Sequence, residues 1–279
     1  MTTAAWRPAT LAAALEVRAE HPGAIVVAGG TDVMVDVNFG RSKPAEVIDV
    51  SRIEELQAWE RDPDLISVGA CVTFARIVDE LDDQAALAQA AATVGSPQIR
   101  NRATIGGNVA TASPAGDAIA ALAAYDADVV LQSVRGRRVM SWSEFFLGAK
   151  RTAMEPDELV VAVQWQPVDG PAAFAKLGPR GAMVIAVASV CVQLDEQAEE
   201  ARLALGSVGP TVLRATNAER YVSSHWDDID VVRAGALAAE ACTPIDDVRG
   251  SAAYRRLAVA VLTRRVLAWT CADRRRVAA

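Results

Sequence analysis

Residues Thr104–Asp117 read TIGGNVATASPAGD and are the most informative segment of this chain. It combines a Gly-Gly pair with three hydroxyl side chains, Asn108 and Asp117. Small side chains let a ligand approach the backbone closely, and the polar groups offer hydrogen bonds, including one carboxylate for a sugar hydroxyl. We expect a long polar loop here, too small-sided to build core. Loops of this length in compact domains are usually functional.

A second Gly-Gly pair lies in Ala28–Asp32, AGGTD, directly after the apolar run Ala24–Val27. Glycines accept positive φ, so consecutive N–H groups can point into one concavity and hold an anion such as a pyrophosphate. Asp49 lies about 20 residues on, where a Rossmann domain has its ribose-binding acid. However, G-x-G-x-x-G is absent and Val33–Val37 predicts a strand, which argues against a Rossmann domain. Two such segments predict a ligand with two phosphates, a dinucleotide held between loops.

The remaining pattern is that of an α+β protein in two parts. A Pro/Gly/Asp cluster, Pro167–Pro171, predicts a linker between domains at 1–167 and 172–273. Helices are predicted over Thr10–Glu20, Thr73–Leu81, Gln84–Thr93, Ala118–Tyr125, Ala215–Val222, Asp228–Cys242 and Ser251–Thr270. Strands are predicted over Ala24–Val27, Val33–Val37, Glu46–Val50, Leu65–Gly69, Val129–Gln132, Arg138–Met140, Leu159–Trp165, Phe174–Leu177, Val184–Leu194 and Arg202–Ser207. In the last helix, helical spacing places Tyr254 and Leu257 on the apolar face and Arg255 off it.

Composition excludes several kinds of chemistry. The 279 residues carry 28 Lys+Arg against 35 Asp+Glu, a net charge of −7, which argues against a nucleic-acid partner. There are only two histidines, and the four cysteines are scattered singly, so the sequence predicts no metal site and no catalytic side-chain triad. Any redox chemistry must therefore come from a cofactor.

The sequence also bears on location. The N-terminal pattern is not that of a secretory signal, and the longest apolar stretch, Ala182–Val192, is far too short to span a bilayer. Cysteines without a pairing pattern fit a reducing compartment. We expect a cytoplasmic protein without a membrane span.

Read together, these motifs resemble the FAD-binding (medium) subunit of the molybdenum hydroxylases, the xanthine dehydrogenase family. The resemblance covers nearly the whole chain. It is carried by AGGTD (28–32), QIRNRATIGGNVATASPAGD (98–117), SEFFLGAKRT (143–152), DELV (157–160), KLGPRGAMVIAVASV (176–190) and DDVRGSAAYRRLAVAVLTRRVL (246–267). It implies an FAD-binding domain of the vanillyl-alcohol-oxidase (PCMH) type in two α+β subdomains. A C-terminal α+β flavoprotein domain of the carbon monoxide dehydrogenase type follows.

The resemblance also implies the cofactor-binding residues. The FAD pyrophosphate and ribitol would be held by Ala28, Gly29, Gly30, Thr31, Asp32, Thr104, Ile105, Gly106, Gly107 and Asn108. Thr111 and Asp117 fall on further FAD-contacting positions, and Lys176 on a lysine near the flavin ring. A cation there would stabilise the anionic reduced flavin by Coulomb attraction. A lysine at a strand edge is the alternative interpretation of Lys176 from the residues alone.

The chain departs from members of the family in three respects. Thr31-Asp32 replaces the His-Ser typical of carbon monoxide dehydrogenase medium subunits, which favours the xanthine, aldehyde and N-heterocycle branch. The isolated cysteines argue against the extra cluster of the 4-hydroxybenzoyl-CoA reductase type. At 180–181, where relatives often carry two basic residues, this chain has Arg180-Gly181.

The implied function is electron transfer within a heteromeric enzyme. A large subunit would hold the molybdenum cofactor and a small one two [2Fe–2S] clusters, while this chain's FAD would pass electrons to an external acceptor. The expected assembly is a dimer of heterotrimers. Two alternatives stay open: a self-sufficient flavin oxidase, which substrate turnover by the isolated chain would reveal, and a flavin-free scaffolding protein. Loss of bound flavin in Gly107→Asp would argue against the scaffolding protein, because that protein binds no flavin.

Overall fold

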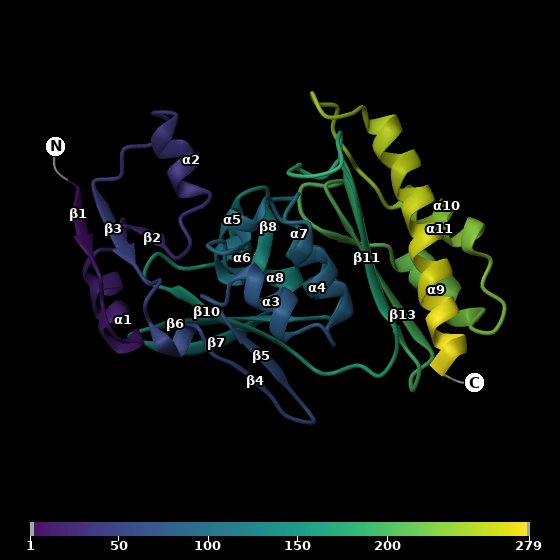
Figure 1. Ribbon diagram of the computed structural model, residues 1–279, viewed down its shortest axis with the longest axis horizontal. Coiled ribbons are helices and arrows are strands. Elements are labelled where there is room, and N and C mark those ends of the chain that lie inside the picture. Colours follow the sequence, from purple (N-terminus) through teal and green to yellow (C-terminus); the bar gives the residue numbers. More distant parts are fainter. Residues whose placement is uncertain (1–2, 278–279) are drawn as a thin grey trace.

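The computed structural model describes residues 3–277, with side chains through residue 274. The sheets follow one another along the long axis of the molecule (Figure 1). A small N-terminal sheet lies at one end, a central sheet covered by short helices lies in the middle, and a C-terminal sheet backed by long helices lies at the other end. The α+β organisation expected from the sequence is confirmed.

The N-terminal sheet is parallel and has the order β1-β3-β2. Its strands are β1 (Ala4–Trp6), β2 (Ile25–Val27) and β3 (Glu46–Asp49), and its helices are α1 (Leu11–Glu20) and α2 (Val33–Asn38). The strand predicted over Val33–Val37 is wrong, because this segment forms α2, none of whose residues is buried. Parallel neighbours need a crossover connection, and α2 lies in the connection between β2 and β3.

The central sheet is antiparallel and has the order β4-β5-β10-β6-β7. Its strands are β4 (Trp59–Arg61), β5 (Ile66–Gly69), β6 (Asp128–Ser133), β7 (Gly136–Ser141) and β10 (Leu159–Trp165). The strand that comes last in the chain, β10, therefore occupies the centre of the sheet. Residues 70–127, between β5 and β6, form most of the helical layer on this sheet.

Short helices make up that layer. They are α3 (Phe74–Glu80), α4 (Ala85–Ala92), α5 (Pro97–Arg100), α6 (Ile105–Thr111), α7 (Asp117–Ala124) and α8 (Trp142–Phe145), followed by the hairpin strands β8 (Phe146–Gly148) and β9 (Arg151–Thr152). The short helix η1 (Glu54–Leu56) lies outside this layer, because its Leu56 packs in the core of the N-terminal part. The loop predicted over Thr104–Asp117 is thus partly wrong: its first half is α6, whose Ile105 and Val109 are fully buried. The Thr104 hydroxyl caps this helix by accepting from the Gly107 N–H at 3.1 Å.

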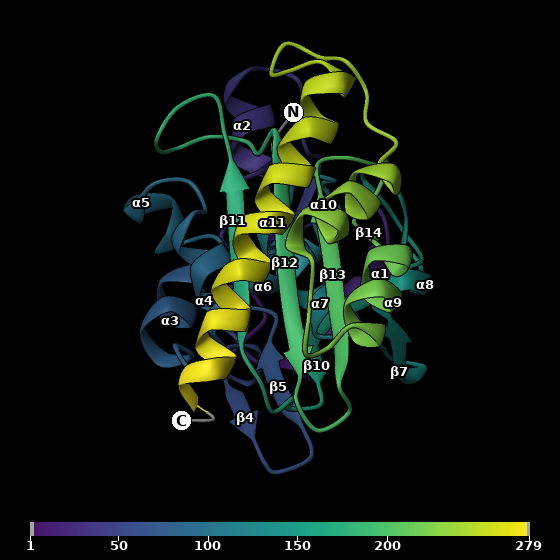
Figure 2. The same cartoon turned by 90° about the vertical axis from the view of Figure 1, so that its right-hand side faces the viewer.

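The C-terminal sheet has the antiparallel order β11-β12-β13-β14. Its elements are β11 (Ala172–Leu177), β12 (Ala188–Asp195), β13 (Glu200–Gly206), β14 (Leu213–Arg214), α9 (Thr216–Ser224), α10 (Val231–Glu240) and α11 (Ala252–Val277). The three helices cover its outer face (Figure 2), and α4 and α7 pack against its inner face. The expected start of a strand at Val184 is wrong, because 178–187 form a loop before β12.

The buried face of α11 also differs from the prediction. Tyr254 and Leu257, expected inside, are 47% and 62% exposed, whereas Arg255 is buried among carbonyl groups. Ala258, Val259 and Val266 lie on the buried side of the helix. A guanidinium with enough hydrogen-bond acceptors takes an interior position that hydropathy assigns to apolar residues.

Candidate functional site

A cleft of about 510 Å³ lies where the N-terminal sheet, the helical layer and the C-terminal part meet. The loop after β2 forms one wall, and α6 with the turn before α7 forms the opposite wall. Val184 and Ile185 of the β11–β12 loop complete it. The predicted site residues that line it are Ala28, Gly29, Gly30, Thr31, Asp32, Thr104, Gly107, Asn108, Thr111 and Asp117. The structure thus brings together segments separated by more than 70 positions in the chain.

The first segment, 28–32, is a loop of hydrogen-bond donors. A Cβ on Gly29 would come within 1.8 Å of the Arg102 carbonyl oxygen, so this position requires glycine for close packing. Gly30 has φ +75°, a conformation that side chains rarely adopt. Within residues 3–277, no hydrogen bond uses the N–H groups of Gly29–Asp32. Consecutive unpaired N–H groups beside a cleft form a cradle for an anion.

The second segment, 104–108, uses its glycines differently. The Ile105 and Gly106 N–H groups donate to the Val72 and Ala70 carbonyls at 3.1 and 2.9 Å. A Cβ on Gly106 would lie 2.4 Å from the Ala70 Cβ, so this glycine lets α6 pack directly on the chain after β5. Ile105 and Gly106 consequently lie beneath the cleft and do not line it, while Gly107 and Asn108 face it.

A buried ion pair closes this wall. The Lys176 Nζ lies 2.5 Å from Asp117 Oδ2 and 3.2 Å from the Thr93 carbonyl oxygen, and both charged side chains are more than nine-tenths buried. Burial raises the pKa of the Asp117 carboxyl, and the nearby Lys176 ammonium opposes that rise. Asp117 lines the cleft, whereas Lys176 lies behind it.

Two acceptor oxygens on this wall have no partner. Asp117 Oδ1 and Asn108 Oδ1 are buried and make no hydrogen bond within the described residues. Buried polar atoms are nearly always paired, so two such atoms beside one cleft indicate a ligand with hydroxyl or N–H donors. The sequence pattern predicted Asn108 and Asp117 as site residues, but it did not indicate that each would have an oxygen without a hydrogen-bond donor.

Other residues on the cleft were not predicted. Phe74, Val94, Ile99 and Ile185 add apolar surface suited to a planar ring system. Ile185 lies within the stretch KLGPRGAMVIAVASV (176–190), but only the fold shows that this apolar side chain is 52% exposed and lines the cleft. Lys150 lies at the edge, with its Nζ 3.9 Å from Asp32 Oδ2.

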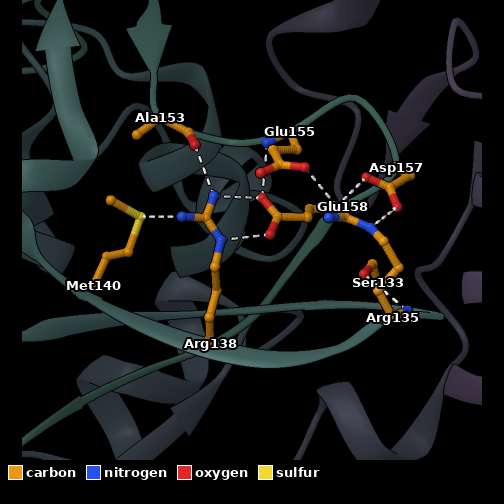
Figure 3. A network of polar contacts seen from close by, with 8 residues as sticks. All are labelled: Ser133, Arg135, Arg138, Met140, Ala153, Glu155, Asp157 and Glu158. Atoms are coloured by element: carbon orange, nitrogen blue, oxygen red, sulfur yellow. Dashed lines mark hydrogen bonds and ion pairs between the residues drawn. The ribbon is translucent and has the colours of Figure 1, made fainter.

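The β8–β9 hairpin that carries Lys150 is held from both sides. Its Lys150 N–H donates to the Ala112 carbonyl, at the end of α6, at 2.9 Å. The chain after β9 is fixed by a polar network in which Arg138 contacts both carboxylate oxygens of Glu158, at 2.5 and 2.8 Å, and the Ala153 carbonyl (Figure 3). Arg135 pairs with Asp157 beside it. The network fixes the chain after β9 to β7, and the Lys150–Ala112 bond ties the hairpin to the end of α6.

These features fit a flavin dinucleotide. The 28–32 loop offers N–H donors for phosphate oxygens, the opposite wall offers acceptors for ribityl or ribose hydroxyls, and the apolar residues accommodate a ring. No cluster of three or more metal-ligating side chains occurs within residues 3–277. In this α+β architecture, the cleft defines a flavoprotein of the dinucleotide-binding class.

Comparison with known proteins identifies the family. The model for the FAD binding domain in molybdopterin dehydrogenase matches residues 1–165, and that for the CO dehydrogenase flavoprotein C-terminal domain matches 173–270. The chain belongs to the family of FAD-binding medium subunits of the molybdenum-containing dehydrogenases, the xanthine dehydrogenase family. It is therefore an oxidoreductase subunit, and the expected two-part flavoprotein fold is confirmed.

Individual relatives agree with this assignment. The nicotinate dehydrogenase FAD-subunit of Eubacterium barkeri is 39% identical over 181 residues, which span 61% of each chain. The 6-hydroxypseudooxynicotine dehydrogenase complex subunit alpha of Paenarthrobacter nicotinovorans is 32% identical, covering 87% of this chain and 85% of that one. Among solved structures, quinoline 2-oxidoreductase from Pseudomonas putida 86 superposes with a TM-score of 0.90 at 26% identity, covering 98% of both chains.

Proposed function

We propose that this chain binds FAD in the cleft between segments 28–32 and 104–117 and serves as the electron-transfer subunit of a heteromeric molybdenum hydroxylase. The proposal rests on one observation. Among the described residues, one wall of the cleft presents N–H groups without an acceptor, and the opposite wall presents buried oxygens without a donor. FAD supplies the redox chemistry when bound, taking electrons from the [2Fe–2S] clusters of a partner subunit and giving them to an external acceptor.

The chain's own residues bind and orient the cofactor. The N–H groups of Gly29–Asp32 donate to the pyrophosphate, and Gly107 leaves room for it to approach. Asn108, Thr111 and Asp117 supply oxygens for hydroxyl groups. Ile105 and Gly106 act from beneath the cleft by holding α6 against Ala70 and Val72.

In this proposal Lys176 does not contact the flavin ring but acts through Asp117. Its ammonium group is paired with Asp117 behind the cleft wall. It keeps the Asp117 carboxylate in a fixed position, with Oδ1 available to the ligand.

We also propose the assembly and the location. The partners are a large molybdenum-cofactor subunit and a small [2Fe–2S] subunit, in agreement with relatives named as a medium chain and a medium subunit. The proposed assembly is a dimer of heterotrimers. No described helix is long and apolar enough to cross a membrane. The four buried cysteines fit a reducing compartment, which supports a cytoplasmic location. The proposed domains are 1–167 and 172–273.

Reconstitution of the full chain with FAD tests the function. We expect bound flavin with a visible spectrum in the wild type and none in Gly107→Asp, because the new carboxylate would enter the cleft and repel the pyrophosphate. Gly23→Asp is the matched control, since a Cβ at Gly23 meets nothing within 4 Å. A wild-type chain that binds no FAD would contradict the proposal, and substrate turnover by this chain alone would favour a self-sufficient oxidase.

A further inference from the structure

Arg255 is a buried arginine that joins three segments of the C-terminal part. Its side chain is 3% exposed. One terminal nitrogen, Nη1, donates to the Val187 carbonyl at 2.6 Å and to the Ser207 carbonyl at 2.9 Å. The other, Nη2, donates to Asp247 Oδ1 at 2.7 Å. A planar guanidinium can make these contacts at once, whereas a lysine ammonium presents no such fork.

Both carbonyl contacts lead directly to the cleft. Val187 lies two residues after Ile185, which lines the cleft from the β11–β12 loop. Ser207 donates its N–H to the Pro114 carbonyl at 2.8 Å. Pro114 in turn lies between Ser113 and Ala115, which line the cleft wall before α7. A single side chain therefore holds the base of the β11–β12 loop and the Ser207 turn that bonds to the cleft wall.

The structure around Ser207 and Arg255 has features that are unfavourable for the stability of the fold. Ser207 has φ +65°, which is unfavourable for a residue with a side chain. Its Oγ and the Arg255 Nε are buried without a hydrogen-bond partner among the described residues. Replacing all members of a buried ion pair by apolar residues often costs no stability. Backbone strain of this kind persists where the surroundings over-determine it, and it is concentrated at functional sites.

We propose that Arg255 is a positioning residue for the FAD cleft: through Ser207 and Val187 it fixes the turn at Pro114 and the base of the β11–β12 loop. The proposal rests on FAD being the ligand of the cleft. Under this proposal the C-terminal part affects FAD affinity through Arg255, in addition to Val184 and Ile185, which line the cleft.

FAD titration of the full-length apoprotein tests this role. Arg255→Met removes all three contacts, and Arg255→Lys keeps the charge but loses the fork. Arg256→Met is the matched control, because Arg256 is the exposed neighbour on the same helix. We expect the Kd for FAD to rise about tenfold in Arg255→Met, or about 1.4 kcal/mol, less in Arg255→Lys, and not at all in Arg256→Met.

Hydrogen exchange separates positioning from general stability. Positioning predicts faster exchange of the Ser207 amide and of residues 113–116 in Arg255→Met and Arg255→Lys. A purely structural role predicts faster exchange through α11 and β12, with 113–116 as in the wild type. If Arg255→Met does not fold, Arg255→Lys gives the decisive affinity and exchange data.

The outcomes separate the two proposals. Folded Arg255 variants with a Kd for FAD within about twofold of Arg256→Met would overturn the positioning role and leave FAD binding intact. A wild-type chain without affinity for FAD would overturn the proposed function itself.

Discussion

The two Gly-Gly segments look alike in sequence and do different physical work. In each pair one glycine allows backbone to pack against backbone: Gly29 against Arg102 and Gly106 against Ala70. The N–H groups of the two segments differ. Those of 29–32 make no hydrogen bond within residues 3–277, whereas those of Ile105 and Gly106 donate to the chain after β5. The first segment therefore offers donors, and the second builds the wall from which Asn108 and Asp117 offer acceptors.

The largest expected effect comes from a Cβ at the packing glycines. Gly29→Ala and Gly106→Ala each force backbone apart and should cost about 5 kcal/mol, comparable to the whole stability of a marginal domain. Urea unfolding measures the loss. Gly23→Ala, in open space, should stay within about 0.5 kcal/mol of the wild type. Near-wild-type stability of Gly106→Ala would show that the second segment is not a packing element.

The reactivity of the Cys71 thiol reports on how closely α6 packs against Ala70. Cys71 follows Ala70, and burial, with a smaller contribution from the Asp49 charge, raises its pKa to about 12. The thiol should therefore react slowly with a disulfide reagent at pH 8 in the wild type. Gly106→Ala should accelerate this reaction, because it pushes α6 away from Ala70.

A smaller effect is expected from the acceptor wall. Asp117→Asn leaves the Lys176 ammonium buried without its counter-charge and should cost about 3 kcal/mol in urea unfolding. The double variant Asp117→Asn/Lys176→Met removes the stranded charge and should regain most of that stability without regaining FAD affinity. Recovery of FAD binding in the double variant would show that the Asp117 carboxylate is not a ligand group.

The smallest effect is expected at the edge of the donor loop. Lys150 and Asp32 form an ion pair at 3.9 Å in which both side chains are more than half exposed. Lys150→Met should change stability by less than about 0.5 kcal/mol and leave the Kd for FAD nearly unchanged, like the control Lys43→Met. A large loss of FAD affinity would mean that the 28–32 segment depends on side-chain charge more than on its N–H groups.

Most residues that the sequence predicted for a binding site line one cleft, whereas several of the elements around it were predicted wrongly. Glycines and small polar residues indicated both segments, because such residues are required for close approach, but the pattern treated both as anion cradles and did not show that the Ile105 and Gly106 N–H groups are bonded. Val33, Val35 and Val37 alternate like a strand, yet the parallel pairing of β2 with β3 requires a crossover there. Helix α6 was missed because Gly106 and Gly107 are poor helix formers, and packing against Ala70 compensates for this.

Contacts between distant segments were beyond the sequence pattern. Arg255 falls off the apolar stripe of its helix, and only the fold shows carbonyl groups around it. The Asp117–Lys176 pair joins α7 to β11 across 59 positions. Periodicity describes the environment of one element at a time, so it cannot show which acceptors another element supplies.

The central place of β10 has a consequence for synthesis on the ribosome. Because Leu159–Trp165 pairs with both β5 and β6, these two strands have no common neighbour until residue 165 has emerged. At a synthesis rate of about 5–20 residues per second, the edge of β5 that pairs with β10 stays unpaired for several seconds. Such edges invite pairing with other chains. The nascent flavoprotein should thus be most prone to aggregation between the synthesis of β5 and that of β10, and cofactor loading can begin only afterwards.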